Sequence, residues 1–299
     1  MKKLIVNADG FGFTFGNNKA IFEILPRGFV KSVSVNVTWE AVKETPILAR
    51  DFPHVTIGIH WNLSVGPPIC DPKEIPSLVG TNGEFHNQDF PRRALKHQLN
   101  IEEMKRELRA QAKVLLDMGV PITHWDSHQS RHIYPGFFEA AIEVAKELGI
   151  MNARSNRYFL PFHKPRWLHR AMYYTRKPIR IITHWLGARK MKYFIQAGMR
   201  VPDYRVGIVT LGEGAEYRPD AWREMLSQLP EGISEIACHP GYPDDVLRKY
   251  SSMIESRYKE LQFLKSDIPS RLAEEAGVES VSFAALDPSL RNHDKLRED

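Results

Sequence analysis

Short apolar runs alternate along this chain with longer segments in which apolar residues recur every three or four positions. The short runs are typical of buried strands, whereas the longer period indicates amphipathic helices. The expected strands are residues 4–7, 32–37, 55–59, 122–125, 151–154, 206–209, 233–238 and 280–283. The expected helices are residues 17–25, 40–50, 101–116, 136–148, 219–229, 244–264 and 270–276. Strands alternating with helices predict a parallel sheet, and this many units favour an α/β fold of the distorted (β/α) barrel type over an open doubly wound sheet.

Two stretches interrupt this alternation. Residues 64–100 are rich in Pro, Gly and Asn and have no clear period, which predicts a long insertion that caps one end of the barrel. Residues 157–203 form a second insertion, which is basic and aromatic. We therefore expect one barrel domain over residues 1–285 that includes both insertions. The polar residues 286–299 are expected to form a tail.

Composition places the chain among ordinary folded proteins. Of its 299 residues, 42% are hydrophobic and 26% are charged. Cys70 and Cys238 are too few for a disulfide framework, which favours a reducing cytoplasm. The apolar run near the N-terminus covers only residues 4–6, so it is interpreted as a strand and not as a signal peptide. No run approaches the roughly 18 to 20 apolar residues that span a bilayer, so no integral membrane segment is expected.

Polar residues cluster directly after the predicted strands. Asn7 and Asp9 follow the first strand, and His60 with Asn62 follows the third. Two further clusters are THWDSHQSRH, residues 123–132, and CHPGYPDD, residues 238–245. Because the loops at the carboxyl ends of barrel strands build the active site, these clusters are predicted to converge.

The clusters contain ligands suited to a divalent metal. Asp9, His60 and His128 offer a carboxylate and imidazoles from three strand ends. A zinc or magnesium ion held there would polarise a carbonyl and lower the pKa of water. His124 and His132 are competing ligands, since spacing on a loop does not choose among these histidines. Any one of them taken singly is more often a hydrogen-bonded core residue, so the metal prediction depends on the group.

The same segments are similar to the motifs of one known family. NADGFG, beginning at Asn7, resembles the NADDFG opening of the YdjC-like carbohydrate deacetylases, and IGIHWNLSVG resembles their GLHLNLT segment. THWDSHQSRH is similar to HxDSHHHxH, and EIACHPGY matches the late HPG motif. With order and spacing kept over about residues 1–285, the chain is identified as a member of this family. The chitooligosaccharide deacetylase and hopanoid-biosynthesis-associated branches are the related groups considered.

The resemblance implies a distorted α/β barrel and metal-dependent removal of an N-acetyl group from an amino sugar or sugar-lipid conjugate, with metal-activated water attacking the amide carbonyl. It makes Asp9 the general base, His60 and His128 metal ligands, and His239 the acid that protonates the departing amine. Arg154 contacts substrate or stabilises an oxyanion, or forms a structural ion pair. The residues expected to bind substrate or support the ligands are Asn7, Asn62, His124, Asp126, His132 and Arg154.

Gly10 departs from the family pattern, which has a second, metal-binding aspartate there. Three explanations are open: Asp9 has taken over metal binding, the position was changed to trap an inactive state, or the chain is a natural variant that binds sugar without hydrolysing it. Two histidines alone hold a hard divalent ion poorly, so weakened metal binding is predicted. The alternative function is therefore a catalytically impaired saccharide-binding member of the same fold.

The second insertion has an unusual charge distribution. Residues 161–200 contain ten Lys or Arg and no Asp or Glu, with helical patterns over 166–174 and 188–197. Basic and aromatic residues together fit an element lying on an anionic membrane surface, which a glycolipid substrate at the inner membrane face would explain. The alternative is a solvated basic face. No nucleic-acid partner is expected, because no binding module accompanies the charge, and a homo-oligomer is compatible with the sequence.

Overall fold

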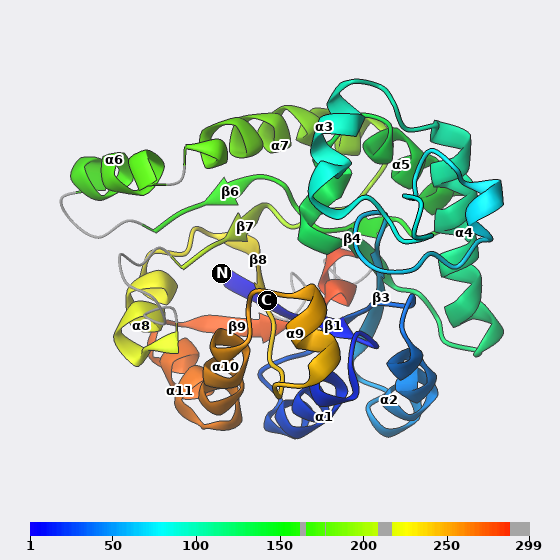
Figure 1. Cartoon of the computed structure of the whole chain (residues 1–299). Coiled ribbons are helices and arrows are strands. Elements are labelled where there is room, and N and C mark those ends of the chain that lie inside the picture. The colour runs from blue at the N-terminus through cyan, green and yellow to red at the C-terminus, as the bar shows by residue number, and fades with distance from the viewer. Residues whose placement is uncertain (162–165, 177, 209–216, 288–299) are drawn as a thin grey trace.

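The computed structural model describes residues 1–161, 166–176, 178–208 and 217–287 and contains a curled parallel sheet with helices outside it (Figure 1). The strands are β1 (Lys2–Phe11), β2 (Ser32–Val35), β3 (Thr56–Trp61), β4 (His124–Ser127), β5 (Asn152–Ala153), β6 (Tyr158–Phe159), β7 (Tyr204–Val206), β8 (Gly232–Cys238) and β9 (Val278–Val281). They pair in the order β5-β4-β3-β2-β1-β8-β7-β6, and β9 pairs with β1 outside this path. The predicted α/β fold of the distorted barrel type is confirmed.

The helices lie between the strands along the chain, and most of them pack on the outer side of the sheet. They are α1 (Phe15–Ile24), α2 (Thr45–Asp51), α3 (Phe90–Leu95), α4 (Ile101–Asp117), α5 (Phe137–Glu147), α6 (Arg166–Arg176), α7 (Ile179–Gln196), α8 (Pro219–Ser227), α9 (Asp245–Tyr250), α10 (Glu255–Lys265) and α11 (Ile268–Glu275). In α4, the Asn100 side chain accepts hydrogen bonds from the first free backbone N–H groups, and Met104, Leu108 and Leu115 are fully buried. Capping and burial of one face therefore explain why this segment is helical.

Strand β1 lies at the centre of the sheet and carries the site. Its second half pairs with β2, and its first half, Lys2 to Ile5, pairs with β9. The register with β2 shifts between Asp9 and Phe11, so Gly10 forms a bulge with a backbone φ of 95°. The predicted strand ended at Asn7, but pairing resumes beyond the bulge because glycine tolerates this positive φ.

Several predicted boundaries differ from the structure. The helix expected over 244–264 is broken into α9 and α10, because the backbone at Ser251 is extended. The helix expected over 40–50 begins as a 3-10 turn and becomes helical only at α2, where a proline occupies the first turn. Strand β6 was not predicted, since two residues give no readable alternation. The predicted strand over 206–209 is β7, which starts earlier; residue 209 lies outside the described part.

Both insertions have structure of their own. Residues 64–100 form short turns and α3, and Asn87 and Gln88 from this insertion reach the wall of the main pocket. The basic insertion forms α6 and α7, and Figure 1 shows α6 at the end of the molecule, away from the sheet. Among the described residues, none of the helices has the length and apolar character needed to cross a bilayer. Most of the expected tail lies outside the described residues.

Candidate active site

A pocket of about 600 Å³ opens at the carboxyl ends of the central strands. Its wall includes Asp9 of β1, His60 of β3, His128 just after β4, Arg154 just after β5 and His239 just after β8. Asp9 and His60 lie inside their strands and not on the following loops, because both strands run further than predicted. The structure therefore brings together the five residues to which the sequence gave catalytic, metal-binding or oxyanion roles.

Arg154 is the centre of a buried ionic network. Its Nη1 and Nη2 donate to the Asp9 carboxylate over 2.7 and 2.6 Å, a bidentate arrangement. The guanidinium also contacts Asp126 Oδ2 at 2.6 Å and donates to Glu235 Oε1 at 2.6 Å. All four side chains are at most 4% exposed. Arg154 therefore forms the structural ion pair that the sequence left as one of two alternatives, and it does so beside the pocket.

This network fixes the protonation of Asp9. Burial alone would raise the pKa of its carboxyl group, but the charge and hydrogen bonds of Arg154 outweigh burial and hold the pKa well below its usual range. The same balance lowers the pKa of Asp126. Burial acts to lower the pKa of Arg154, whereas its carboxylate partners hold it well above the ordinary value. Asp9 is therefore an ionised carboxylate at physiological pH.

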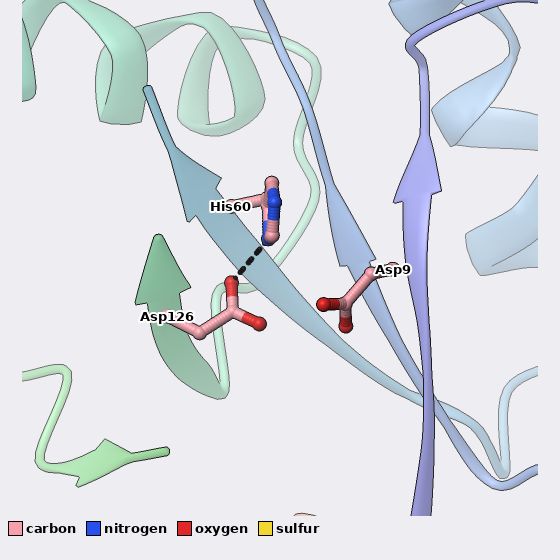
Figure 2. A group of neighbouring side chains, drawn as sticks. All are labelled: Asp9, His60 and Asp126. Atoms are coloured by element: carbon pink, nitrogen blue, oxygen red, sulfur yellow. Dashed lines mark hydrogen bonds and ion pairs between the residues drawn. The ribbon is translucent and has the colours of Figure 1, made fainter. Parts of the chain in front are cut away.

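His60 is oriented toward the pocket by Asp126. Its Nδ1 lies 2.6 Å from Asp126 Oδ1, and with this carboxylate ionised Nδ1 carries the proton. The other ring nitrogen, Nε2, then keeps its lone pair, the arrangement found behind metal-binding histidines. Figure 2 shows the residues Asp9, His60 and Asp126, whose ligand atoms all lie within 4.8 Å of one another.

His128 lies beside this group, which does not include it. Its ring centroid lies 5.5 Å from that of His60. Burial, followed by the neighbouring charge of His60, lowers the pKa of His128 well below its usual value, so its imidazole is neutral and able to bind a cation. The imidazoles of His60 and His128 with the Asp9 carboxylate fit a divalent ion, since they combine nitrogen and oxygen donors in one pocket.

Gly10 has a backbone conformation that would strain an aspartate placed there. Its φ of 95° is strained for any L side chain. A Cβ atom there would lie 3.3 Å from Asn17 Nδ2 and 3.7 Å from Arg257 Nη1. A side chain at this position would therefore point to an arginine as well as to the pocket.

His239 lies beside Asp9. Its Nε2 is 3.6 Å from Asp9 Oδ2, and its backbone N–H donates to Glu260 over 2.6 Å. Burial lowers the pKa of His239 more than the Asp9 charge raises it, so the imidazole is neutral near pH 7. A neutral imidazole beside this carboxylate could accept a proton that Asp9 takes up during a reaction.

Four other predicted residues lie behind the pocket wall. Asn7 donates to Asp9 Oδ1 over 2.7 Å, and His124 Nε2 lies 3.2 Å from Asn7 Oδ1. His132 contacts Ser127 Oγ at 2.6 Å, and the Asn62 side chain holds the turn that follows β3. None of these four is among the residues lining the pocket in the described part of the chain.

Two residues of the site were missed by the sequence analysis. Glu235, which binds Arg154, lies in the middle of β8, and an acidic residue inside an otherwise apolar strand was a readable signal. Arg257 of α10 lines the pocket, but nothing in the sequence around it distinguishes it from other charged residues of an amphipathic helix.

Comparison with known proteins agrees with this geometry. A family model described as YdjC-like protein matches residues 3–275. The carbohydrate deacetylase of Geobacillus stearothermophilus is 31% identical over 284 residues, which cover 93% of this chain and 96% of that protein. The carbohydrate deacetylase of Xenopus laevis is 30% identical over 262 residues, covering 81% and 82%.

A solved structure shares the whole fold. The crystal structure of an Enterococcus faecalis V583 protein, provisionally assigned to cellobiose-phosphate cleavage, matches with a TM-score of 0.75 and 25% identity, covering 95% of this chain and 98% of that one. The chain belongs to the YdjC-like family, and the predicted family is confirmed. The branch within the family stays a prediction.

Proposed function

We propose that this protein is a carbohydrate N-deacetylase, which hydrolyses the acetamide group of an N-acetylated saccharide with a divalent metal ion, zinc or magnesium. One observation carries the proposal. The ionised Asp9, held by Arg154, lies with the imidazoles of His60, His128 and His239 in a pocket at the carboxyl ends of the strands. The curated relatives named carbohydrate deacetylases support the substrate class.

The pocket residues can perform each proton transfer of this reaction. His60, His128 and Asp9 would hold the metal, which supplies polarisation of the amide carbonyl and a lower pKa of water. Asp9 takes a proton from the water as its oxygen adds to the carbonyl carbon. His239, 3.6 Å from Asp9, receives that proton and delivers it to the nitrogen as the C–N bond breaks. The acetic acid formed then gives its proton to the amine, so the products are an ammonium group and acetate.

A second candidate function follows from Gly10. Without a second carboxylate beside Asp9, the metal has fewer anionic ligands, which weakens its binding. In this version the pocket is a saccharide-binding site of the same fold that no longer hydrolyses the acetamide. Residues 1–285 would form one functional unit in either case.

Acetate release distinguishes these functions. The protein is incubated with a panel of N-acetylated saccharides and glycolipids, with zinc, magnesium, cobalt or nickel, and released acetate is measured. We expect release that a chelator removes and one added metal restores, because the imidazole and carboxylate donors need a cation to activate water. Saccharide binding without acetate release under any metal would establish the binding protein instead.

We further propose that the basic insertion contacts an anionic membrane at the inner face, and that the substrate is a sugar-lipid conjugate. The large apolar side chains exposed on α6 and α7 are Trp167, Leu168, Ile181, Ile182, Trp185, Tyr193 and Ile195. Exposed Arg170 and Arg180 lie on the same helices. Arg180 and the neighbouring Tyr158 also line the active-site pocket, so this surface adjoins the site where a lipid-linked sugar would enter.

Vesicle binding tests this surface. The protein is expected to co-sediment with vesicles containing anionic phospholipid and to bind neutral vesicles much less, because each basic residue near an anionic surface contributes about 1 kcal/mol. Replacing Arg170 and Arg180 by Gln should reduce binding by at least about tenfold at physiological salt. Replacing the exposed Arg27 and Arg50 by Gln, which removes the same charge elsewhere, should not. Equal binding by both double variants would contradict the proposal.

A further inference from the structure

Arg257 of α10 is a buried cation without a partner of its own. The residue is 5% exposed, and its Nε and Nη1 atoms make no hydrogen bond to any described residue. Its side chain lines the same pocket as Asp9 and His239. Buried charged groups are nearly always paired, because an unpaired ion loses its hydration without compensation. A guanidinium in a pocket wall that has no hydrogen-bond partner among the described residues is suited to bind an anion that enters the pocket.

The carboxylates near Arg257 are engaged elsewhere. Burial lowers the pKa of Arg257, while Glu260 and Asp9 are the nearest charges that raise it, and the guanidinium still keeps its proton. Asp9 is bound by Arg154, and Glu260 accepts the backbone N–H of His239. Asp244 accepts the N–H of Leu247 at the start of α9. Each acidic neighbour thus has a hydrogen-bond partner other than Arg257.

The position of Arg257 relates it to the reacting group. Its Nη1 is 3.7 Å from the place where a Cβ of residue 10 would lie, and residue 10 directly follows Asp9. In the proposed reaction, the acetyl carbonyl must come within reach of the water that Asp9 deprotonates. Arg257 therefore lines the pocket on the side that adjoins residue 10, next to the Asp9 carboxylate.

We propose that Arg257 binds the acetyl oxygens, stabilising the oxyanion of the tetrahedral intermediate and then the carboxylate of the acetate product. This inference rests on the proposed function. Addition of water places the negative charge on the former carbonyl oxygen while its proton passes to Asp9. Collapse of the intermediate breaks the C–N bond, and the nitrogen takes the proton from His239. The acetic acid formed passes its remaining proton to the amine product, and acetate is left against Arg257. A guanidinium suits this role because its planar N–H pair matches the two oxygens of a carboxylate.

Glycine at position 10 leaves the positive charge of Arg257 without a carboxylate partner at that position. A carboxylate at residue 10 would lie close enough to Arg257 to pair with it, and the donors would then be lost to substrate. Glycine leaves them free. The absence of a carboxylate at residue 10 weakens metal binding. It also leaves Arg257 able to share in stabilising the oxyanion.

Acetate binding by the full-length protein tests the inference without turnover. Binding of [13C]acetate is followed by NMR with a chelator present and the ionic strength held constant with chloride. We expect saturable binding that weakens at least about tenfold in Arg257→Gln, because the charged donors are lost. Arg257→Lys should retain part of it. Arg205→Gln, at the rim of the same pocket, removes the same charge and should bind acetate within about twofold of the unchanged protein.

Stability measurements separate binding from folding. Arg257→Gln should unfold at the same urea concentration or a higher one, because it removes an unpaired buried charge. Gly10→Asp should lose acetate binding by pairing with Arg257, whereas Gly10→Asn, with the same backbone strain but no charge, should keep it. If neither Gly10 variant folds, Arg257→Gln and Arg257→Lys still carry the test.

The outcomes also separate this inference from the proposed function. Deacetylation with kcat lowered about 10²- to 10³-fold in Arg257→Gln would support both. Normal turnover by Arg257→Gln, or acetate binding equal to that of the unchanged protein, would overturn the role of Arg257 and leave the deacetylase. Acetate binding that depends on Arg257, without turnover of any saccharide, would support the anion site and contradict the proposed deacetylase function. Absence of saturable acetate binding by the unchanged protein would also overturn the inference.

Discussion

Replacing Asp9 by Asn is expected to lower kcat for acetate release by about 10²- to 10⁴-fold, the contribution typical of a general base. The amide has the shape of the carboxylate but neither its charge nor its ability to take a proton from water. Arg154 would keep Asp126 and Glu235 as partners, so the pocket should persist. The measurement is kcat and KM on the most active saccharide of the panel, with circular dichroism to verify folding.

A matched control variant and a metal titration show whether Asp9 acts as a base or only as a metal ligand. Asp117→Asn makes the same chemical change at an exposed position of α4 and should leave kcat unchanged. Raising the metal concentration should not restore Asp9→Asn, because a base is missing. Full recovery in excess metal would show that Asp9 acts only as a ligand, and undiminished kcat would remove it from the reaction.

Replacing Arg154 by Met is expected to lower the free energy of unfolding by about 3–5 kcal/mol, the usual effect of removing one partner from a buried ion pair. The change leaves Asp9, Asp126 and Glu235 buried together without their shared cation. Burial already raises the pKa of Glu235 despite Arg154, so without it at least one of the three carboxyl groups is expected to become protonated. Urea denaturation at constant pH measures the loss.

An exposed ion pair is the control for this variant. Arg109→Met removes an arginine that binds Glu147 in two hydrogen bonds, but both side chains are more than 40% exposed. Solvent screening limits that pair to about 1 kcal/mol or less. A loss for Arg154→Met no larger than for Arg109→Met would mean that the buried network contributes little to stability.

Much of the fold was readable from the sequence because it depends on local patterns. The apolar run at β8 and the periodic α4 were both predicted within a few residues. Boundaries failed where tertiary contacts decide them. Strand β1 continues past Asn7 only because a bulge at Gly10 lets pairing with β2 resume. Strand β6 exists only because β7 pairs beside it.

The site was partly readable for the same reason. Asp9, His60 and His128 were predicted together, since strand ends in a parallel sheet meet at one edge. Spacing along the chain could not tell His128 from His124, because both belong to one short segment, and His128 was selected only by the resemblance to the family. Only the fold turns His128 into the pocket and places His124 against Phe283, with ring centroids 3.9 Å apart.

The sequence by itself determined the family, the parallel α/β architecture and the polar residues at the strand ends, because these depend on periodicity and on short motifs in fixed order. Only the tertiary structure decided which distant residues lie close enough to interact electrostatically. Arg154 meets Glu235 across 81 positions of the chain, and Arg257 comes to Gly10 from a distant helix. Electrostatic interactions depend on distance and burial in space, and spacing along the chain carries neither quantity.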